Sequence, residues 1–201
     1  MTGGRTLALL VLLSVSPSAR LPAQISLRAS VGARYSTTMV HDSVVVPFDL
    51  RPAIAPTVQL GVREQLRGPW TADATLDLSS AKLKRHESGS TLDVGSLTAI
   101  AVTLGLRREL APGIGARLGV GGLVYSTDES GVFQRGKGGV FPLVSLATTY
   151  APQFGTSRGL ELSLQYDLHR FITPALRSVG FNRARPVHRI AVAVSGRLLG
   201  R

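Results

Sequence analysis

Cysteine is absent from the 201 residues of this chain, and bulky aromatic rings and long apolar runs are both scarce. The absence of cysteine excludes disulfides and thiolate metal sites. Aromatic residues make up 5% of the sequence, so the hydrophobic share of 44% consists mainly of small and aliphatic side chains. With 22 glycines as well, this composition is typical of strands and tight turns. No linker rich in proline, glycine or serine divides the chain, which predicts a single domain behind a leader.

The longest apolar run lies at the start of the chain. Arg5 precedes about ten apolar residues (TLALLVLLSV), and a helix-breaking Ser-Pro-Ser and the small Ala23 follow them. This order is that of a signal peptide, whereas a helix that spans a membrane needs roughly 20 apolar residues. We therefore expect residues 1–23 to be a cleaved signal peptide and residues 24–201 to form the exported domain.

The rest of the sequence alternates between apolar and polar residues with a period of two. This is the pattern of β-strands whose two faces meet different surroundings. The first segment, residues 25–36, alternates without exception. Seven further segments repeat the pattern, near 55–66, 70–85, 94–109, 113–126, 139–151, 160–169 and 188–199. Eight strands are therefore expected.

The connections between these segments alternate in length. The first, third, fifth and seventh are long, at approximately 37–54, 86–93, 127–138 and 172–187, whereas the second and fourth are tight and the sixth is intermediate. A barrel that threads a membrane has short periplasmic turns and longer outer loops. The sequence thus predicts an all-β fold, an eight-stranded antiparallel up-and-down transmembrane β-barrel.

Charge pairing across the two tight turns bears on the register of the strands. At the first turn, one pairing places Arg63 opposite Asp73, so that opposite charges meet on the polar face. At the second, Arg117 lies opposite either Arg107 or Glu109, depending on the length of the turn. The register there is left open, as it is for strands four to six in general.

Charged side chains keep to the polar face of the segments. We expect them to form an ion-pair network in the lumen, because the interior of an eight-stranded barrel is just wide enough for side chains to fill and leaves no open pore. The residues of this lumen network are Arg28, Arg34, Arg63, Asp73, Asp77, Arg107, Arg117, Glu161, Asp167, Arg189 and Arg197. A soluble lipocalin-like barrel that binds an apolar ligand inside would show the same alternation and is the alternative.

Aromatic residues near the strand ends are consistent with girdles at the two membrane interfaces. They are Tyr35, Trp70, Tyr125, Tyr150 and Phe171. Tyr125 and Phe171 do not share the parity of the apolar face, so they would need a bulge or a strand end to point outward.

The leader, the eight alternating segments and the four longer loops together resemble the small OmpA/OmpX-like outer-membrane barrels of Gram-negative bacteria. The resemblance covers nearly all of residues 25–199. It implies a protein of the outer membrane, inserted by the barrel-assembly machinery, that displays loops on a scaffold. Members usually end in an aromatic residue that this machinery recognises, whereas this chain ends in Leu198-Leu199-Gly200-Arg201.

Residues suited to catalysis or metal binding are few. Ser163, Asp167 and His169 are the right types for acyl transfer, but Ser163 and His169 lie roughly 20 Å apart along one strand. The other histidines, His41, His86 and His188, lack the spacing of a metal site. We therefore expect no catalytic, cofactor-binding or metal-binding residue and no enzyme, with an outer-membrane lipid A-modifying enzyme as the alternative.

Basic residues gather in or beside two outer connections, within a chain whose net charge is +11. These candidates for anion-binding loops are Lys82, Lys84, Arg85, Arg177, Arg183 and Arg185. Outer-membrane lipid, through the phosphates of lipopolysaccharide, is the expected partner, and an ordinary solvated charge run is the alternative. No nucleic-acid module appears. The expected function is that of a monomeric integral outer-membrane barrel with a structural, adhesive or surface-interaction role.

Overall fold

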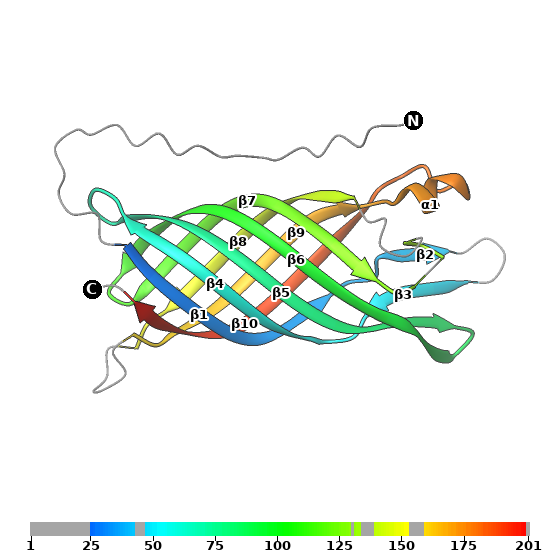
Figure 1. The fold of residues 1–201 in the computed structure, drawn as a ribbon, viewed down its shortest axis with the longest axis horizontal. Coiled ribbons are helices and arrows are strands. Elements are labelled where there is room, and N and C mark those ends of the chain that lie inside the picture. Colours follow the sequence, from blue (N-terminus) through cyan, green and yellow to red (C-terminus); the bar gives the residue numbers. More distant parts are fainter. Residues whose placement is uncertain (1–24, 43–46, 130, 134–138, 153–158, 200–201) are drawn as a thin grey trace, which may run out of the picture.

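The computed structural model describes residues 25–42, 47–129, 131–133, 139–152 and 159–199, and most of them belong to strands (Figure 1). The elements are β1 (Ile25–Ser36), β2 (Val40–Asp42), β3 (Phe48–Pro52), β4 (Ala55–Gln65), β5 (Trp70–Glu87), β6 (Ser90–Ala111), β7 (Ile114–Thr127), β8 (Val140–Tyr150), β9 (Glu161–Phe171), α1 (Pro174–Ser178) and β10 (Arg185–Leu199). The signal peptide predicted for residues 1–23 lies outside the described residues. No helix in the described part of the chain is long and apolar enough to cross a membrane.

Eight of these strands close into a barrel. Going round the wall, the order is β1, β4, β5, β6, β7, β8, β9 and β10, and β10 pairs again with β1. Every neighbouring pair is antiparallel. The strands β2 and β3 form a hairpin whose second strand pairs with the end of β5, beyond the part of β5 that pairs with β4. The predicted eight-stranded antiparallel barrel is therefore confirmed.

The two ends of the barrel differ in how the strands are joined. At the end called here the short-turn end, β4–β5 and β6–β7 are linked by tight turns with Gly68 and Gly113 at positive φ, which glycine adopts without strain. β1 begins and β10 ends there as well (Figure 1). The opposite end, called the loop end, carries the β2–β3 hairpin, the β5–β6 turn and α1 (Figure 1).

The third connection is not the long loop expected at 86–93. Strands β5 and β6 continue as one long hairpin that turns at Ser88-Gly89, both of which have positive φ. Such a two-residue turn matches the twist of the flanking strands, so the ladder extends to the tip. Lys82, Lys84 and Arg85 consequently lie in strand β5 rather than in a loop, and Arg185 begins β10.

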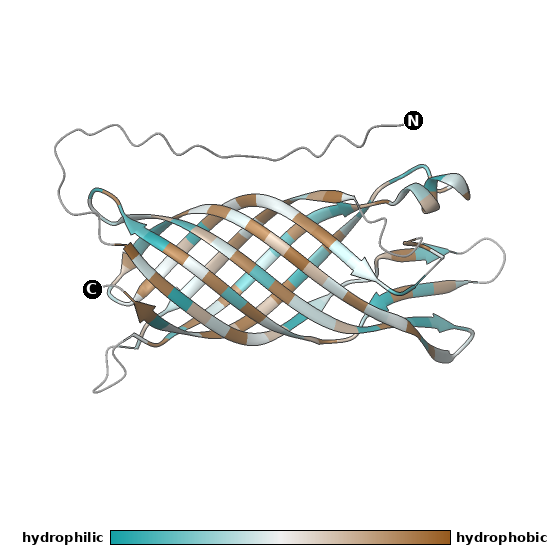
Figure 2. Ribbon diagram, in the orientation of Figure 1, coloured by the Kyte–Doolittle hydropathy of each residue, from teal (hydrophilic) through white to brown (hydrophobic). Residues whose placement is uncertain are grey.

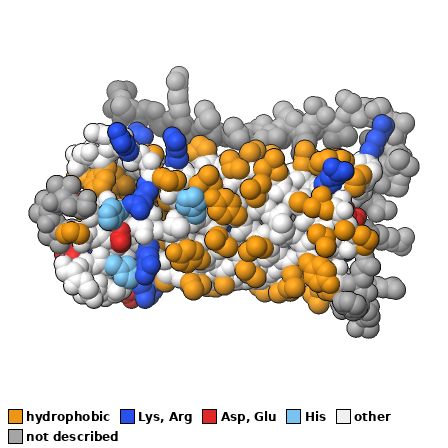
Figure 3. Space-filling model, turned by 180° about the vertical axis from the view of Figure 1, so that it is seen from behind, with side chains coloured by type: hydrophobic (Ala, Val, Ile, Leu, Met, Phe, Trp, Pro, Cys, Tyr) orange, Lys and Arg blue, Asp and Glu red, His pale blue; other side chains and the backbone are white. Residues whose placement is uncertain are grey.

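The alternation of the sequence places apolar side chains on the outside of the barrel. Val31 is 63% exposed, Leu104 62% and Val192 58%, whereas Arg34 and Asp167 on the inner face are at most 2% exposed. Figure 2 shows hydrophobic and hydrophilic residues alternating along each strand, and Figure 3 shows apolar side chains spread over the middle of the barrel wall. This distribution is the reverse of that in a soluble barrel with an apolar interior.

The inner face becomes apolar towards the loop end. The buried cluster there is formed by Met39, Val40, Leu50, Leu83, Leu97, Ala99, Ala101, Leu123, Tyr125, Phe133, Phe141, Leu143, Phe171, Leu176 and Val187. Tyr125 and Phe171 are 3% and 1% exposed, so they are part of this core and not of an outer girdle. They share the parity of the inner face and no register shift breaks the β7–β8 or β9–β10 pairing. The other predicted girdle residues, Tyr35, Trp70 and Tyr150, are exposed.

Candidate functional site

The middle of the interior holds two arginines and two aspartates from four strands. Arg34 of β1 contacts both Asp77 of β5 and Asp167 of β9. Arg189 of β10 lies 3.9 Å from the Asp77 carboxylate and donates to the Ser79 hydroxyl at 3.3 Å. All four charged side chains are at most 4% exposed. The two positive and two negative charges compensate one another, as buried ions require.

The charged residues nearer the short-turn end show which register the second tight turn adopts. Arg107 and Arg117 lie directly opposite each other on β6 and β7, although like charges in that position repel. Each pairs with a carboxylate on a strand that is not its neighbour in the wall. The Nε of Arg117 donates to Asp73 of β5 at 2.7 Å, and Arg107 pairs with Glu161 of β9. The predicted register of Arg63 opposite Asp73 is confirmed, but the ion pair of Arg63 is with Glu161.

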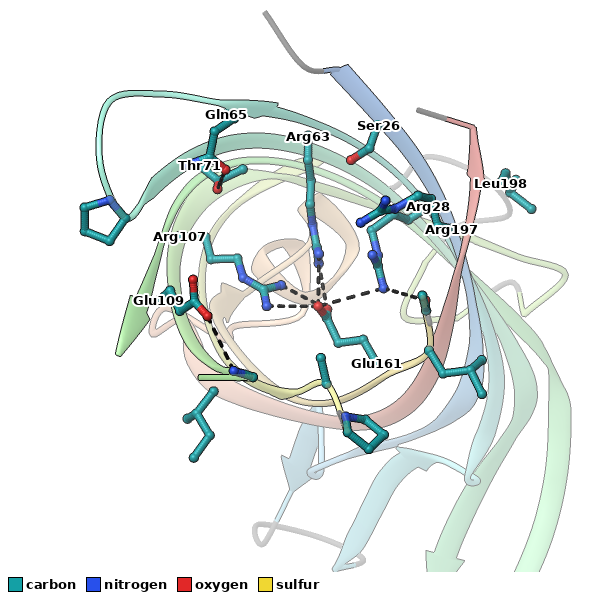
Figure 4. A pocket seen from close by; sticks show the side chains of 17 residues that line it. Ser26, Arg28, Arg63, Gln65, Thr71, Arg107, Glu109, Glu161, Arg197 and Leu198 are labelled. Atoms are coloured by element: carbon teal, nitrogen blue, oxygen red, sulfur yellow. Dashed lines mark hydrogen bonds and ion pairs between the residues drawn. The ribbon is translucent and has the colours of Figure 1, made fainter. Parts of the chain in front are cut away.

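Three arginines converge on the single carboxylate of Glu161 (Figure 4). Arg63 donates through both terminal nitrogens at 3.1 and 2.8 Å, and the two terminal nitrogens of Arg107 lie 2.9 Å from the two carboxylate oxygens. Arg28 is farther, at 3.8 Å, and donates instead to the Gly159 carbonyl and the Ser195 hydroxyl, both at 3.2 Å. Glu161 is only 4% exposed. The single negative charge of Glu161 is thus surrounded by the positive charges of three arginines.

These arginines line a cavity of about 960 Å³ at the short-turn end (Figure 4). Among the residues that the structure describes, its charged lining consists of Arg28, Arg63, Arg107, Glu109, Glu161 and Arg197. Arg197 comes from the end of β10 and is exposed, unlike the other arginines of the predicted lumen network. Four positive and two negative side chains therefore face the same space.

At the other end of the interior the charges give way to rings. The ring of Tyr125 lies 5.7 Å from that of Phe141 and 5.8 Å from that of Phe171, and Phe133 packs against both Tyr125 and Phe171. The hydroxyl of Tyr125 lies 3.1 Å from Nε2 of His169, at the border of the charged middle. The apolar cluster of the loop end therefore stands directly on the ion-pair layer.

The residues weighed for acyl transfer each have another partner. Ser163 donates to the Ala193 carbonyl at 3.3 Å, Asp167 contacts Arg34, and His169 contacts Tyr125. No hydrogen bond joins any two of the described residues Ser163, Asp167 and His169. Among the described residues, no group of three His, Cys, Asp or Glu side chains could hold a metal ion.

The six basic residues predicted at outer loops fall into two separate groups. On β5, Lys82 is exposed, Lys84 is half-buried, and Arg85 lies over the ring of Phe48 at 4.3 Å and pairs with Glu87. The second group comprises Arg177 on α1 and Arg183 and Arg185 beyond it, and β4 and β1 separate β5 from β10 in the wall. The structure therefore does not bring the six residues into one site.

Arg183 and Arg185 line a pocket of about 240 Å³ at the loop end. Its apolar lining includes Phe171, Leu176 and Phe181. The sequence from residue 168 to residue 199 contains no acidic residue, so no carboxylate within this segment neutralises these arginines. The pocket thus has apolar residues and two arginines in one lining, and Figure 3 shows basic side chains gathered at this end.

Several solved structures of other proteins have a similar fold. The chain is similar to Ail, the attachment invasion locus protein of Yersinia pestis, in a complex with the heparin analogue sucrose octasulfate, at a TM-score of 0.53 and 9% identity over 88% of this chain and 99% of Ail. The fold is that of the small outer-membrane β-barrels. Neisserial surface protein A matches this barrel at a TM-score of 0.53 and 6% identity, over 87% of the chain and 96% of that protein.

A third solved outer-membrane barrel is also similar to this chain. The protein AlkL, solved in lipid bilayers, matches at a TM-score of 0.51 and 12% identity, over 92% of this chain and 95% of AlkL. No protein-family model and no curated protein sequence matches the chain. At these identities the likeness is one of barrel architecture.

Sequence reasoning missed the convergence of Arg28, Arg63 and Arg107 on Glu161. Alternation says which residues face inward but not which of them meet across the lumen. The one available signal was composition, because the predicted lumen network contains seven arginines and four acidic residues. That excess of positive charge had to collect somewhere in the interior.

Proposed function

We propose that this chain is an integral outer-membrane barrel with a filled interior, which acts as a scaffold and binds polyanions at the outer surface through its loop end. The observation that carries the proposal is the inverted distribution of side chains, with aliphatic residues exposed round the wall and charged ones inside. Exposed apolar surface of this extent requires hydrocarbon around it. Export through a cleaved signal peptide and insertion by the barrel-assembly machinery are part of the proposal.

The filled interior supports a scaffold rather than a pore. Arg34, Asp77, Asp167 and Arg189 occupy the middle of the barrel, and the aromatic cluster lies behind them. An eight-stranded barrel has no further room beside such side chains. Passage of a solute would require separating buried ion pairs, which is costly.

The loop end supplies the binding surface of this proposal. In outer-membrane barrels the tight turns face the periplasm and the longer connections face outward. Arg183 and Arg185 beside an apolar pocket suit a phosphate or sulfate group on an amphiphilic or polymeric carrier, since guanidinium groups bind such oxyanions with two hydrogen bonds. The sulfated ligand bound to the similarly folded Ail supports this chemistry.

The membrane part of the proposal is tested by refolding and fractionation. We expect the chain without residues 1–23 to fold in detergent or lipid vesicles and not in buffer, with β-rich circular dichroism and heat-modifiable mobility in gels, and to fractionate with outer membranes. A soluble monomer that folds without detergent would contradict the proposal.

The binding part is tested with two probes that distinguish lipid from polysaccharide. The refolded barrel is titrated with a soluble sulfated polysaccharide and, separately, incorporated into vesicles with and without lipopolysaccharide. We expect salt-sensitive binding to at least one probe that is weakened in the double variant Arg183→Gln/Arg185→Gln. Arg108→Gln, an exposed arginine near the short-turn end, is the matched control and should bind normally. Equal binding by all three proteins, or by none, would overturn the loop-end assignment.

A further inference from the structure

The cavity at the short-turn end contains an unusual pairing of like charges. Arg28 of β1 lies directly opposite Arg197 of β10 in the ladder, and both side chains line the cavity. Like charges directly opposite each other destabilise a sheet. Across the lumen Arg107 escapes the same situation by binding Glu161, but no described carboxylate lies within 4.0 Å of Arg197 that would relieve this pair.

Arg28 is the least compensated of the three arginines around Glu161. Both oxygens of Glu161 already accept from Arg63 and Arg107, and Arg28 stays 3.8 Å away. Its side chain is only 9% exposed, and its buried Nε has no hydrogen-bond partner. A buried charged donor without an acceptor costs free energy that an incoming anion would recover.

The charge of the lining sets the kind of ligand. Arg28, Arg63, Arg107 and Arg197 contribute four positive charges, and Glu109 and Glu161 contribute two negative ones, so the described residues of the lining carry a net charge of 4 − 2 = +2. A phosphate group of a monoester carries about −1.5 to −2 at neutral pH. Its several oxygens can accept paired hydrogen bonds from two guanidinium groups, whereas chloride offers a single acceptor atom and a single negative charge.

We propose that this cavity binds a dianionic oxyanion, of the phosphate monoester or dicarboxylate class, between Arg28 and Arg197. Glu161 holds Arg63 and Arg107 in fixed positions and so keeps the remaining positive charge on the β1–β10 side of the cavity. Gln65 and Thr71, which also line the cavity, add a polar wall on the opposite side (Figure 4). The site is at the end of the barrel opposite to the proposed polyanion surface and does not rest on it.

The experiment measures binding of phenyl phosphate and of succinate to the full chain refolded in a nonionic detergent. Isothermal titration and the shift of the thermal unfolding midpoint are recorded at constant ionic strength, with chloride as the reference anion. We expect at least one dianion to bind and to raise the midpoint. Arg197→Gln and Arg28→Gln should each weaken that binding about tenfold or more, the change expected for loss of a charged hydrogen bond.

Matched variants separate a site from a general effect of charge. Arg108→Gln removes an exposed arginine that lies over Trp70 near the same end and should leave binding unchanged. Arg197→Glu places a carboxylate opposite Arg28, so we expect it to abolish binding and to raise the unfolding midpoint of the ligand-free barrel. Because Arg197 is exposed, its variants should fold even where Arg28→Gln does not.

Two results would overturn the proposal. The first is the absence of any dianion effect beyond that of chloride, which would mean that the cavity has no preference for a dianion. The second is equal binding by the parent barrel, Arg197→Gln and Arg197→Glu, which would place the anion elsewhere. Loss of binding in the Arg183→Gln/Arg185→Gln variant, with Arg197→Gln unaffected, would assign the dianion to the loop end instead.

Discussion

The two ends of the barrel interior are built from the same alternating pattern and have opposite chemistry. At the short-turn end, three arginines surround Glu161 beside an open cavity. At the loop end, inward-facing positions hold rings and aliphatic side chains such as Phe141, Phe171 and Leu123. The balanced ion pairs of Arg34 and Asp167 lie between them. Whether a residue is buried therefore depends on whether it falls on the inward-facing alternate positions of its strand. Whether the buried group is charged or apolar depends on its position along the barrel axis.

Asp167→Asn should have the largest effect on stability, because it tests the buried ion pairs in the middle of the interior. This change leaves the buried Arg34 with one carboxylate instead of two, and we expect a loss of about 3–5 kcal/mol in the free energy of unfolding. Denaturant titration in lipid vesicles measures it. Asp93→Asn, at an exposed position of β6, should change stability by close to nothing. Equal effects of the two changes would mean that the middle of the barrel is hydrated.

The apolar end is tested by Leu123→Ala. Leu123 is fully buried in the aromatic cluster, so the change leaves a void and should cost about 2–5 kcal/mol. The same measurement on Leu104→Ala, which is 62% exposed on the outer wall, should give a smaller loss because lipid can occupy the vacated space. A larger loss for Leu104→Ala would show that the loop-end cluster is poorly packed.

The short-turn end should lose less stability than the middle of the barrel when an ion pair is removed. Arg63 is 21% exposed, and Glu161 keeps Arg107 and Arg28 when Arg63 is changed to Gln. We expect a change of about 1 kcal/mol or less in the same titration, because the removal also relieves repulsion among three cations. A loss as large as that of Asp167→Asn would remove the distinction between the two regions.

The smallest effect is expected at the outer edge of the loop end. A carboxylate oxygen of Asp128 accepts the backbone N–H of Ser96 at 2.7 Å, and this bond lowers the pKa of Asp128 below its ordinary value. Because the folded-state pKa is the lower one, the stabilisation is present above the ordinary carboxyl range and is lost as pH falls through the folded value. Amide exchange of Ser96 should therefore accelerate on acidification. Asp128→Asn should show no such pH dependence beyond that of intrinsic exchange.

The sequence predicts the wall of the barrel much better than its contents. The number and order of the eight barrel strands and the position of Arg63 opposite Asp73 follow from alternation and turn chemistry, which are local, whereas the hairpin of β2 and β3 within the first connection was not predicted. The position of Arg107 opposite Arg117 does not follow from these rules, because each arginine is neutralised by a carboxylate on a strand that is not its neighbour in the wall, which rules for adjacent strands ignore. Tyr125 was assigned to the wrong environment as an aromatic near a strand end, although its parity already indicated the inner face.

The long β5–β6 hairpin has a consequence for what the barrel can touch. Strand β6 runs over 22 residues, whereas roughly 9–11 residues are enough for a tilted strand to cross the hydrocarbon of a bilayer. About half of β6 must therefore stand clear of the lipid. β5 pairs with β6 along almost its whole length, and β3 pairs in turn with the outer part of β5. The tip of this hairpin, which carries Lys84 and Arg85, therefore extends the barrel wall past the length of strand that hydrocarbon covers.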